Sequence, residues 1–145
     1  MLTTLVEANT YLNTRPFTEK WIVLSDLDKT KFLTMASNKI EKLPFIGEKE
    51  NNEQATLFPR VIKSNSPYIV IEETPDEVKW AVYEEALAIF KYMNEERYKL
   101  REQGIQSASR GGLSESYETY RPIEELISAM AKSYLRDWIV QSASI

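Results

Sequence analysis

The stretch from Thr74 to Gly104, "TPDEVKWAVYEEALAIFKYMNEERYKLREQG", decides the fold because it predicts one long central helix. Thr74 is suited to the N-cap, and Pro75 suits the first helical position. The two acidic residues that follow Pro75 lie where the helix dipole favours negative charge. Gly104 closes the other end. From Trp80 to Met93 apolar side chains occur nearly all round the helix, so we expect it to be packed on several sides.

Three further helices are predicted, two before this stretch and one after it. Thr3 or Thr4 is placed to cap a short helix that carries Leu5, Ala8 and Leu12 at helical spacing. Ser25 is placed to cap a second helix, which should end before Pro44. After Pro122, apolar residues recur at steps of three and four and predict a continuous last helix; they are Ile123, Leu126, Ile127, Met130, Ala131, Tyr134, Leu135, Trp138 and Ile139.

Two segments between the helices predict loops. Residues 44–73 indicate a long loop with short extended pieces, which is either a contact surface or a disordered insertion. Residues 107–120, "SASRGGLSESYETY", show a Gly-Gly pair and alternating residues, which predict a β-hairpin or β-like loop. Such a hairpin should pack on its own helices or pair with another chain, and a flexible linker remains the alternative. The predicted fold is therefore mainly α: a single domain, residues 1–145, with a small bundle of about four helices, a long loop and a β-hairpin insertion.

Composition limits the function. The chain has 145 residues, of which 43% are hydrophobic, and a formal net charge of −4, which disfavours a protein that mainly grips phosphate backbones. It has no cysteine and no histidine, which removes thiol nucleophiles, histidine bases and nearly all zinc sites. No apolar run approaches the length of a membrane span, and the N-terminus lacks a signal-peptide pattern. We expect a soluble intracellular product without a membrane partner.

Adjacent acidic residues are the one pattern that could indicate catalysis. Such pairs occur at Glu72-Glu73, Glu84-Glu85, Glu95-Glu96 and Glu124-Glu125, and a metal-dependent hydrolase could in principle use them. Neighbours on a helix point about 100° apart and do not converge on one atom, so solvated faces explain these pairs better. We expect no enzyme, and we predict no catalytic, metal-binding or cofactor-binding residue and no cofactor.

The order of short motifs along the chain adds a resemblance. The motifs are "EANTYL", Trp21, "KTKFLTMASNKIEKLPFIG", Gln54 with "LFPR", and "TPDEVKWAVYEEAL". In this order the chain resembles the tailed-phage head-tail connector family, also called adaptor or head-completion proteins. Part of that group is labelled DnaT-like single-stranded DNA-binding. The likeness runs over nearly the whole chain.

The resemblance implies a structural role in the virion. Family members are made in the bacterial host cytoplasm and form a dodecameric ring under the portal protein. The ring extends the channel through which double-stranded DNA passes without sequence-specific binding, and it gives the stopper or tail-completion protein a docking surface. Carried onto this sequence, it implies that the long loop, the hairpin and the C-terminal tail form the interfaces with the portal and with neighbouring copies. The predicted interface residues are Gln54, Phe58, Pro59, Arg60, Arg110, Gly111, Gly112, Tyr117, Tyr120, Trp138 and Ile145.

A single-stranded DNA-binding protein is the alternative. Bases stack on exposed aromatic rings beside basic side chains in such proteins. The candidate stacking residues are Tyr68, Trp80, Tyr117 and Tyr120, beside Lys63 and Arg110. The net charge argues against this function, and Trp80 is better explained as a core residue.

Overall fold

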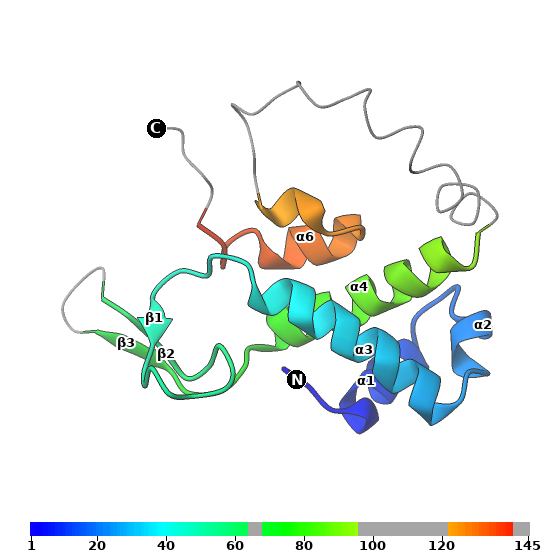
Figure 1. Cartoon of the computed structure of the whole chain (residues 1–145), viewed down its shortest axis with the longest axis horizontal. Helices are drawn as coiled ribbons and strands as arrows, with labels where there is room; N and C mark the ends of the chain where they lie inside the picture. Colours follow the sequence, from blue (N-terminus) through cyan, green and yellow to red (C-terminus); the bar gives the residue numbers. More distant parts are fainter. Residues whose placement is uncertain (64–67, 96–121, 141–145) are drawn as a thin grey trace, which may run out of the picture.

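The computed structural model describes residues 1–63, 68–95 and 122–140. Within these ranges the protein is mainly helical, with a small antiparallel sheet at one end of its longest axis (Figure 1). The helices are α1 (Leu5–Leu12), α2 (Glu19–Ile22), α3 (Asp26–Glu41), α4 (Asp76–Met93), the 3-10 helix η2 (Pro122–Glu125) and α6 (Ala129–Leu135). The strands are β1 (Glu48–Lys49), β2 (Arg60–Ile62) and β3 (Ile69–Ile71). The mainly helical prediction is confirmed, whereas the hairpin predicted at residues 107–120 lies outside the described residues.

Helix α4 is the centre of the bundle. It packs against α3, α6 and α1, and its buried residues face all of these neighbours. The predicted central packing is therefore confirmed. The predicted ends were wrong: Pro75 is the N-cap rather than the first helical residue, and the helix ends at Met93 with Asn94 as C-cap instead of running toward Gly104. The Asn94 amide bonds back to the carbonyls of Phe90 and Lys91, and the sequence turns polar from this residue on.

The first two predicted helices form with their predicted caps. Thr4 Oγ1 accepts a hydrogen bond from the Glu7 amide at 3.2 Å, and Ser25 Oγ accepts one from the Asp28 amide at 3.1 Å. Each bond satisfies an amide at a helix start that has no partner within the helix. Helix α2 was not predicted. It carries the buried Trp21 into an aromatic cluster with Phe32 and Phe90.

The last helix was predicted as one continuous element, and this prediction was wrong. The segment forms η2, then a break, then α6, whose N-cap is Ser128. At the break, the backbone amides of Ile127 and Ser128 donate to the Glu85 carboxylate at 2.9 to 3.0 Å. A buried acceptor from α4 thus replaces the intrahelical bonds that a continuous helix would need.

The predicted long loop contains the three-stranded sheet. Strand β2 lies in the middle, and it pairs with β1 through Glu48 and Val61 and with β3 through Arg60 and Ile71. Strand β1 is a polar Glu-Lys pair, so no alternating apolar pattern revealed it. Gly47 precedes β1 with φ +76°, and a Cβ there would lie 2.5 Å from the Val61 carbonyl oxygen. Only glycine fits this turn.

The C-terminal segment closes the fold against the start of this loop. The Ile46 amide donates to the Trp138 carbonyl, and the Val140 amide donates to the Pro44 carbonyl, both at 2.8 Å. Phe45 and Ile139 form a β-bridge between these bonds. Among the helices of the described ranges, none combines the length and the apolar character needed to cross a membrane.

Candidate interaction surface

The sheet projects from the helical bundle, and Arg60 on β2 holds its base together. The guanidinium donates to four backbone carbonyls, those of Phe45, Ile46, Leu57 and Gly47, at 2.9 to 3.3 Å. Burial lowers the pKa of Arg60, because the charged form loses water contacts. These bonds replace that water and fix two loop segments around one side chain.

Gln54 organises the turn between β1 and β2. Its side-chain amide donates to the carbonyls of Thr56 and Pro59 at 2.9 and 2.8 Å, and its oxygen accepts from the Asn51 amide at 3.1 Å. The polar stretch that composition alone left open to disorder therefore has a defined conformation. Its order comes from side-chain bonds to its own backbone, since few apolar residues are present.

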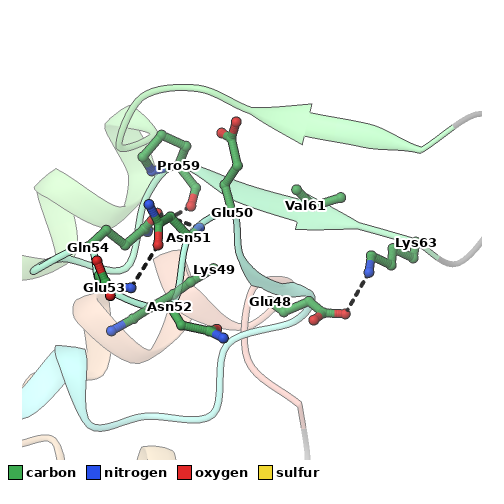
Figure 2. Close-up of a pocket in the computed structure, with 10 residues that line it drawn as sticks. All are labelled: Glu48, Lys49, Glu50, Asn51, Asn52, Glu53, Gln54, Pro59, Val61 and Lys63. Atoms are coloured by element: carbon green, nitrogen blue, oxygen red, sulfur yellow. Dashed lines mark hydrogen bonds and ion pairs between the residues drawn. The ribbon is translucent and has the colours of Figure 1, made fainter.

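An open hollow of about 900 Å³ lies along this turn and the sheet (Figure 2). Its lining is polar and comprises Glu48, Lys49, Glu50, Asn51, Asn52, Glu53, Gln54, Pro59, Val61 and Lys63. Glu48 and Lys63 form an ion pair at 3.2 Å across the two strands. Three carboxylates against two ammonium groups make this hollow a poor match for a phosphate backbone.

The outer strand of the sheet carries exposed apolar side chains. On this strand Ile69 and Val70 are 55% and 44% exposed, and Tyr68, directly before it, is 62% exposed. Lys63 Nζ lies 5.9 Å from the centre of the Tyr68 ring. Strand β3 has β2 on one side and, among the described strands, no neighbour on the other. An edge strand with exposed apolar residues can pair with or pack on another chain.

Most of the predicted interface residues that the structure describes serve the interior. Phe58 and Arg60 are buried, and the half-buried Trp138 packs edge-on against Phe58 at 6.1 Å. These three side chains therefore pack within this chain, and their assignment to an interface with another protein stays a prediction. Gln54 and Pro59 are half-buried. The remaining predicted residues, Arg110, Gly111, Gly112, Tyr117, Tyr120 and Ile145, lie outside the described residues.

Trp80 is a core residue, as the sequence indicated. Its ring lies 6.4 Å from that of Tyr11 and 5.6 Å from that of Tyr134, between α1 and α6. It is half-buried and belongs to the packing around α4. Of the candidate stacking rings in the described ranges, Tyr68 is the exposed one.

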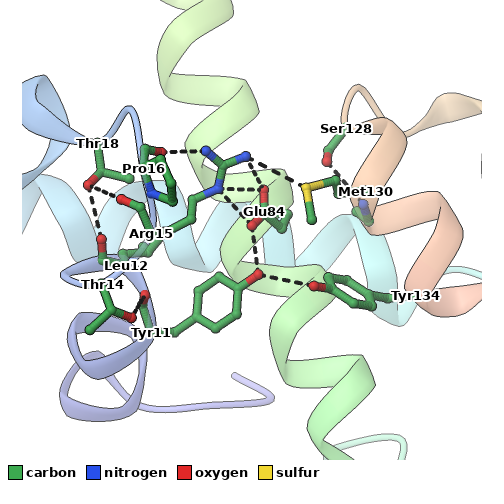
Figure 3. Close-up of polar contacts among 11 residues, drawn as sticks. Tyr11, Leu12, Thr14, Arg15, Pro16, Thr18, Glu84, Ser128, Met130 and Tyr134 are labelled. Atoms are coloured by element: carbon green, nitrogen blue, oxygen red, sulfur yellow. Dashed lines mark hydrogen bonds and ion pairs between the residues drawn. The ribbon is translucent and has the colours of Figure 1, made fainter.

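Glu84 forms a buried ion pair that the sequence did not predict (Figure 3). Arg15 donates to both of its carboxylate oxygens at 2.9 Å, and the Tyr11 hydroxyl donates to it at 2.7 Å. The hydrogen bonds that Arg15 donates to Glu84 raise the pKa of Arg15. The pKa of Tyr11 is raised, mainly by burial and next by the hydrogen bond with Tyr134. This network joins α1, α4 and α6.

Glu85 is buried on a different face of α4, about 100° round the helix from Glu84. Lys39 Nζ lies 2.6 Å from its carboxylate, which also accepts the two amides at the break before α6. The prediction that Glu84 and Glu85 form a solvated face was therefore wrong. Their position inside a segment that is apolar all round was the available signal, because a solvated pair does not fit there. The two carboxylates bind different partners, as helix geometry requires.

No group of three or more acidic side chains that could hold a metal ion occurs in residues 1–63, 68–95 and 122–140. The features described above define a mainly helical protein that presents a projecting antiparallel sheet with an exposed apolar edge. The chain belongs to the family described as "Putative DnaT-like ssDNA binding protein", which matches residues 2–144. No curated protein and no solved structure matches the chain. The match confirms the DnaT-like part of the resemblance, whereas the head-tail connector assignment stays a prediction.

Proposed function

We propose that the chain is a structural subunit of a head-tail connector, which assembles as a ring under a portal protein and offers a docking surface to a stopper or tail protein. The role is one of binding, without catalysis or cofactor. The ring extends the DNA channel of the virion. The observation that carries the proposal is the projecting sheet, whose edge strand β3 exposes Ile69 and Val70 next to the exposed Tyr68.

The construction of the sheet supports this role. A ring subunit must present a fixed surface to several neighbours, and rigid presentation lowers the entropy cost of association. Arg60 and Gln54 hold the projecting element through seven hydrogen bonds to or from backbone groups. The charge balance also agrees, since an acidic surface lets DNA pass without being retained.

Co-sedimentation with the portal protein of the same virus tests the proposal. The chain should move from slow fractions into the portal peak in a density gradient, at a fixed ratio to portal. Gradients of the chain alone and of portal alone are the controls. A chain that stays in the slow fractions at every mixing ratio contradicts the proposal.

Binding of single-stranded DNA is the second candidate, and the description of the family favours it. On the described surface its best support is the exposed Tyr68 ring beside Lys63. That lysine is paired with Glu48, and three carboxylates line the adjacent hollow, which weakens any attraction for phosphates.

Fluorescence anisotropy of a labelled oligonucleotide separates the two candidates. At low salt and again near physiological salt, the connector proposal expects no saturable binding. Binding that weakens steeply as salt is raised would favour the DNA-binding function. Tyr68→Ala would then reduce affinity, while the exposed Val6→Ala on α1 would leave it unchanged.

A further inference from the structure

A second exposed apolar surface surrounds α2. Its members are Phe17, Ile22, Val23 and Leu27, with exposed fractions of 74%, 42%, 81% and 65%. All four lie within eleven residues of sequence, and Phe17 also lines a hollow beside α2. We call this set the α2 patch.

A hollow of about 400 Å³ opens beside the α2 patch. Trp21, Leu87 and Phe90 contribute apolar lining, and Phe17 lies at its edge. The remaining lining residues are Glu19, Lys20, Lys91, Asn94 and Glu95. An apolar floor with a charged rim is the usual make-up of a site that receives another protein's side chains.

Phe17 is held at this hollow in an unfavourable backbone conformation. Its φ is +64°, in the left-handed region that bulky residues rarely occupy. Its ring is mostly exposed, so burial within this chain does not offset the strain. Strain retained at an exposed aromatic residue points to a binding role for that residue.

The edge of β3 and the α2 patch lie at opposite ends of the molecule. In Figure 1 the sheet occupies one end of the longest axis and α2 the other. One surface is a projecting strand and the other borders a hollow. A projecting strand can enter a hollow, so we compare the edge of β3 on one copy with the hollow on another.

Charged side chains beside the two surfaces can form pairs between copies, Glu72 and Glu73 with Lys20 and Lys91. Lys20 and Lys91 are exposed on the rim of the hollow, and Glu72 and Glu73 are exposed directly after β3. None of these four side chains forms an ion pair within the described ranges. The rim also carries the carboxylates of Glu19 and Glu95, so its net charge is balanced. The charged groups would therefore orient an approaching strand more than attract it.

We propose that β3 of one copy docks in the α2 hollow of a second copy, so that the chain associates head to tail. Each contact leaves one β3 edge and one hollow free, so further copies add until the assembly closes on itself. The inference rests on the proposed ring function and adds the two surfaces and the polarity of the contact.

Complementation between two variants tests the polarity. Ile69→Lys damages the strand surface, and Phe17→Asn with Val23→Lys damages the α2 patch. All three positions are exposed, and asparagine tolerates the backbone of Phe17, so folding should persist. In sedimentation velocity, wild-type chain should form concentration-dependent oligomers, and each variant alone should be monomeric. Their mixture should form a one-to-one dimer that grows no further.

Several outcomes overturn the proposal. A wild-type chain that stays monomeric up to millimolar concentration contradicts the proposal. A single variant that still self-associates also contradicts it, because the contact would then join two identical surfaces. Val6→Lys, an exposed apolar position outside both surfaces, should oligomerise as wild type does. A chain that is monomeric by itself but still co-sediments with portal would contradict the head-to-tail contact. The connector proposal would then still stand.

Disulfide trapping gives an independent readout, because the chain contains no cysteine. Tyr68→Cys mixed with Phe17→Cys should give a cross-linked dimer under mild oxidation. Neither variant alone should do so to a comparable extent. Tyr68→Cys mixed with Val6→Cys is the matched control. Equal cross-linking in the control, or preferential linking of Tyr68→Cys to itself, contradicts the head-to-tail contact.

Discussion

The adjacent residues Glu84 and Glu85 on α4 connect this helix to α1, α3 and α6. Their carboxylates leave different faces of α4, and each is paired with one cation and accepts further hydrogen bonds. A buried carboxylate is tolerable only when it is paired in this way. The two residues therefore fix the positions of α1, α3 and α6 relative to α4.

Glu85→Ala should destabilise the fold by about 3 to 5 kcal/mol, because it leaves Lys39 and the backbone amides of Ile127 and Ser128 without their acceptor. Urea unfolding followed by circular dichroism measures this loss. The exposed Glu77→Ala on the same helix is the control, with an expected change within about 0.5 kcal/mol. Equal effects at the two positions would contradict the role of Glu85.

The left-handed backbone conformation of Phe17 is expected to lower the stability of the fold while it holds the ring at the binding surface. Phe17→Gly should be more stable than Phe17→Ala by about 1 kcal/mol, because glycine relieves the left-handed strain that alanine retains. Both variants remove the same ring, so the comparison isolates the backbone. Thermal unfolding of the pair measures the difference, and an alanine variant at least as stable as the glycine variant would show that the strain is absent.

At the scale of elements, the helices were predictable where their signals are local. The caps at Thr4 and Ser25 and the apolar middle of α4 belong to single segments, and these predictions were correct. The break before α6 depends on the distant Glu85, and the sheet depends on bonds from Arg60 on β2 to carbonyls of the segment before β1. The apolar period across residues 123–139 cannot reveal a carboxylate that arrives from another helix.

Arg60→Lys should loosen the base of the sheet, because one ammonium group cannot donate to four carbonyls in the geometry of a guanidinium. We expect a loss of about 2 kcal/mol and faster amide hydrogen exchange in β1 and β2 than in α3. The exposed Lys63→Arg serves as the control. Unchanged exchange in the strands of Arg60→Lys would contradict this role.

The contact between α1 and α4 should make stability depend on pH. The hydrogen bond from Lys79 lowers the pKa of Glu7, and the same bond raises the pKa of Lys79. The Glu7 contribution is therefore present above the usual glutamate pKa of about 4.3 and is lost as pH falls through its lower folded value. The Lys79 contribution is present below about pH 10.4 and is lost as pH rises through its higher folded value.

Glu7→Gln tests the acid side of this dependence. The difference in unfolding free energy between neutral pH and a pH of about 3 should be smaller in this variant than in wild type. Urea unfolding at both pH values gives the two differences, with Glu77→Gln as the control. A variant that loses as much stability in acid as wild type would rule out the Glu7 contribution.

At the scale of the whole molecule, the candidate surface was predictable only in part. The sequence located it in residues 44–73, but it assigned binding to Phe58 and Arg60, which hold the interior. The exposed residues are Tyr68 to Val70 on the edge of the sheet. The pairing of this segment with β2 decides which of its sides faces solvent. Neither β1 nor β2 carries an alternating apolar pattern that would reveal this pairing in the sequence.

The measurement that tests the central claim most directly is quantitative mass spectrometry of purified virus particles. A head-tail connector subunit is part of the particle, whereas a DNA-binding protein of replication acts in the infected cell. We predict peptides of this chain in the particles at a fixed ratio to portal peptides, retained through repeated density-gradient purification. A chain that is abundant in infected cells and absent from the purified particles would contradict the account.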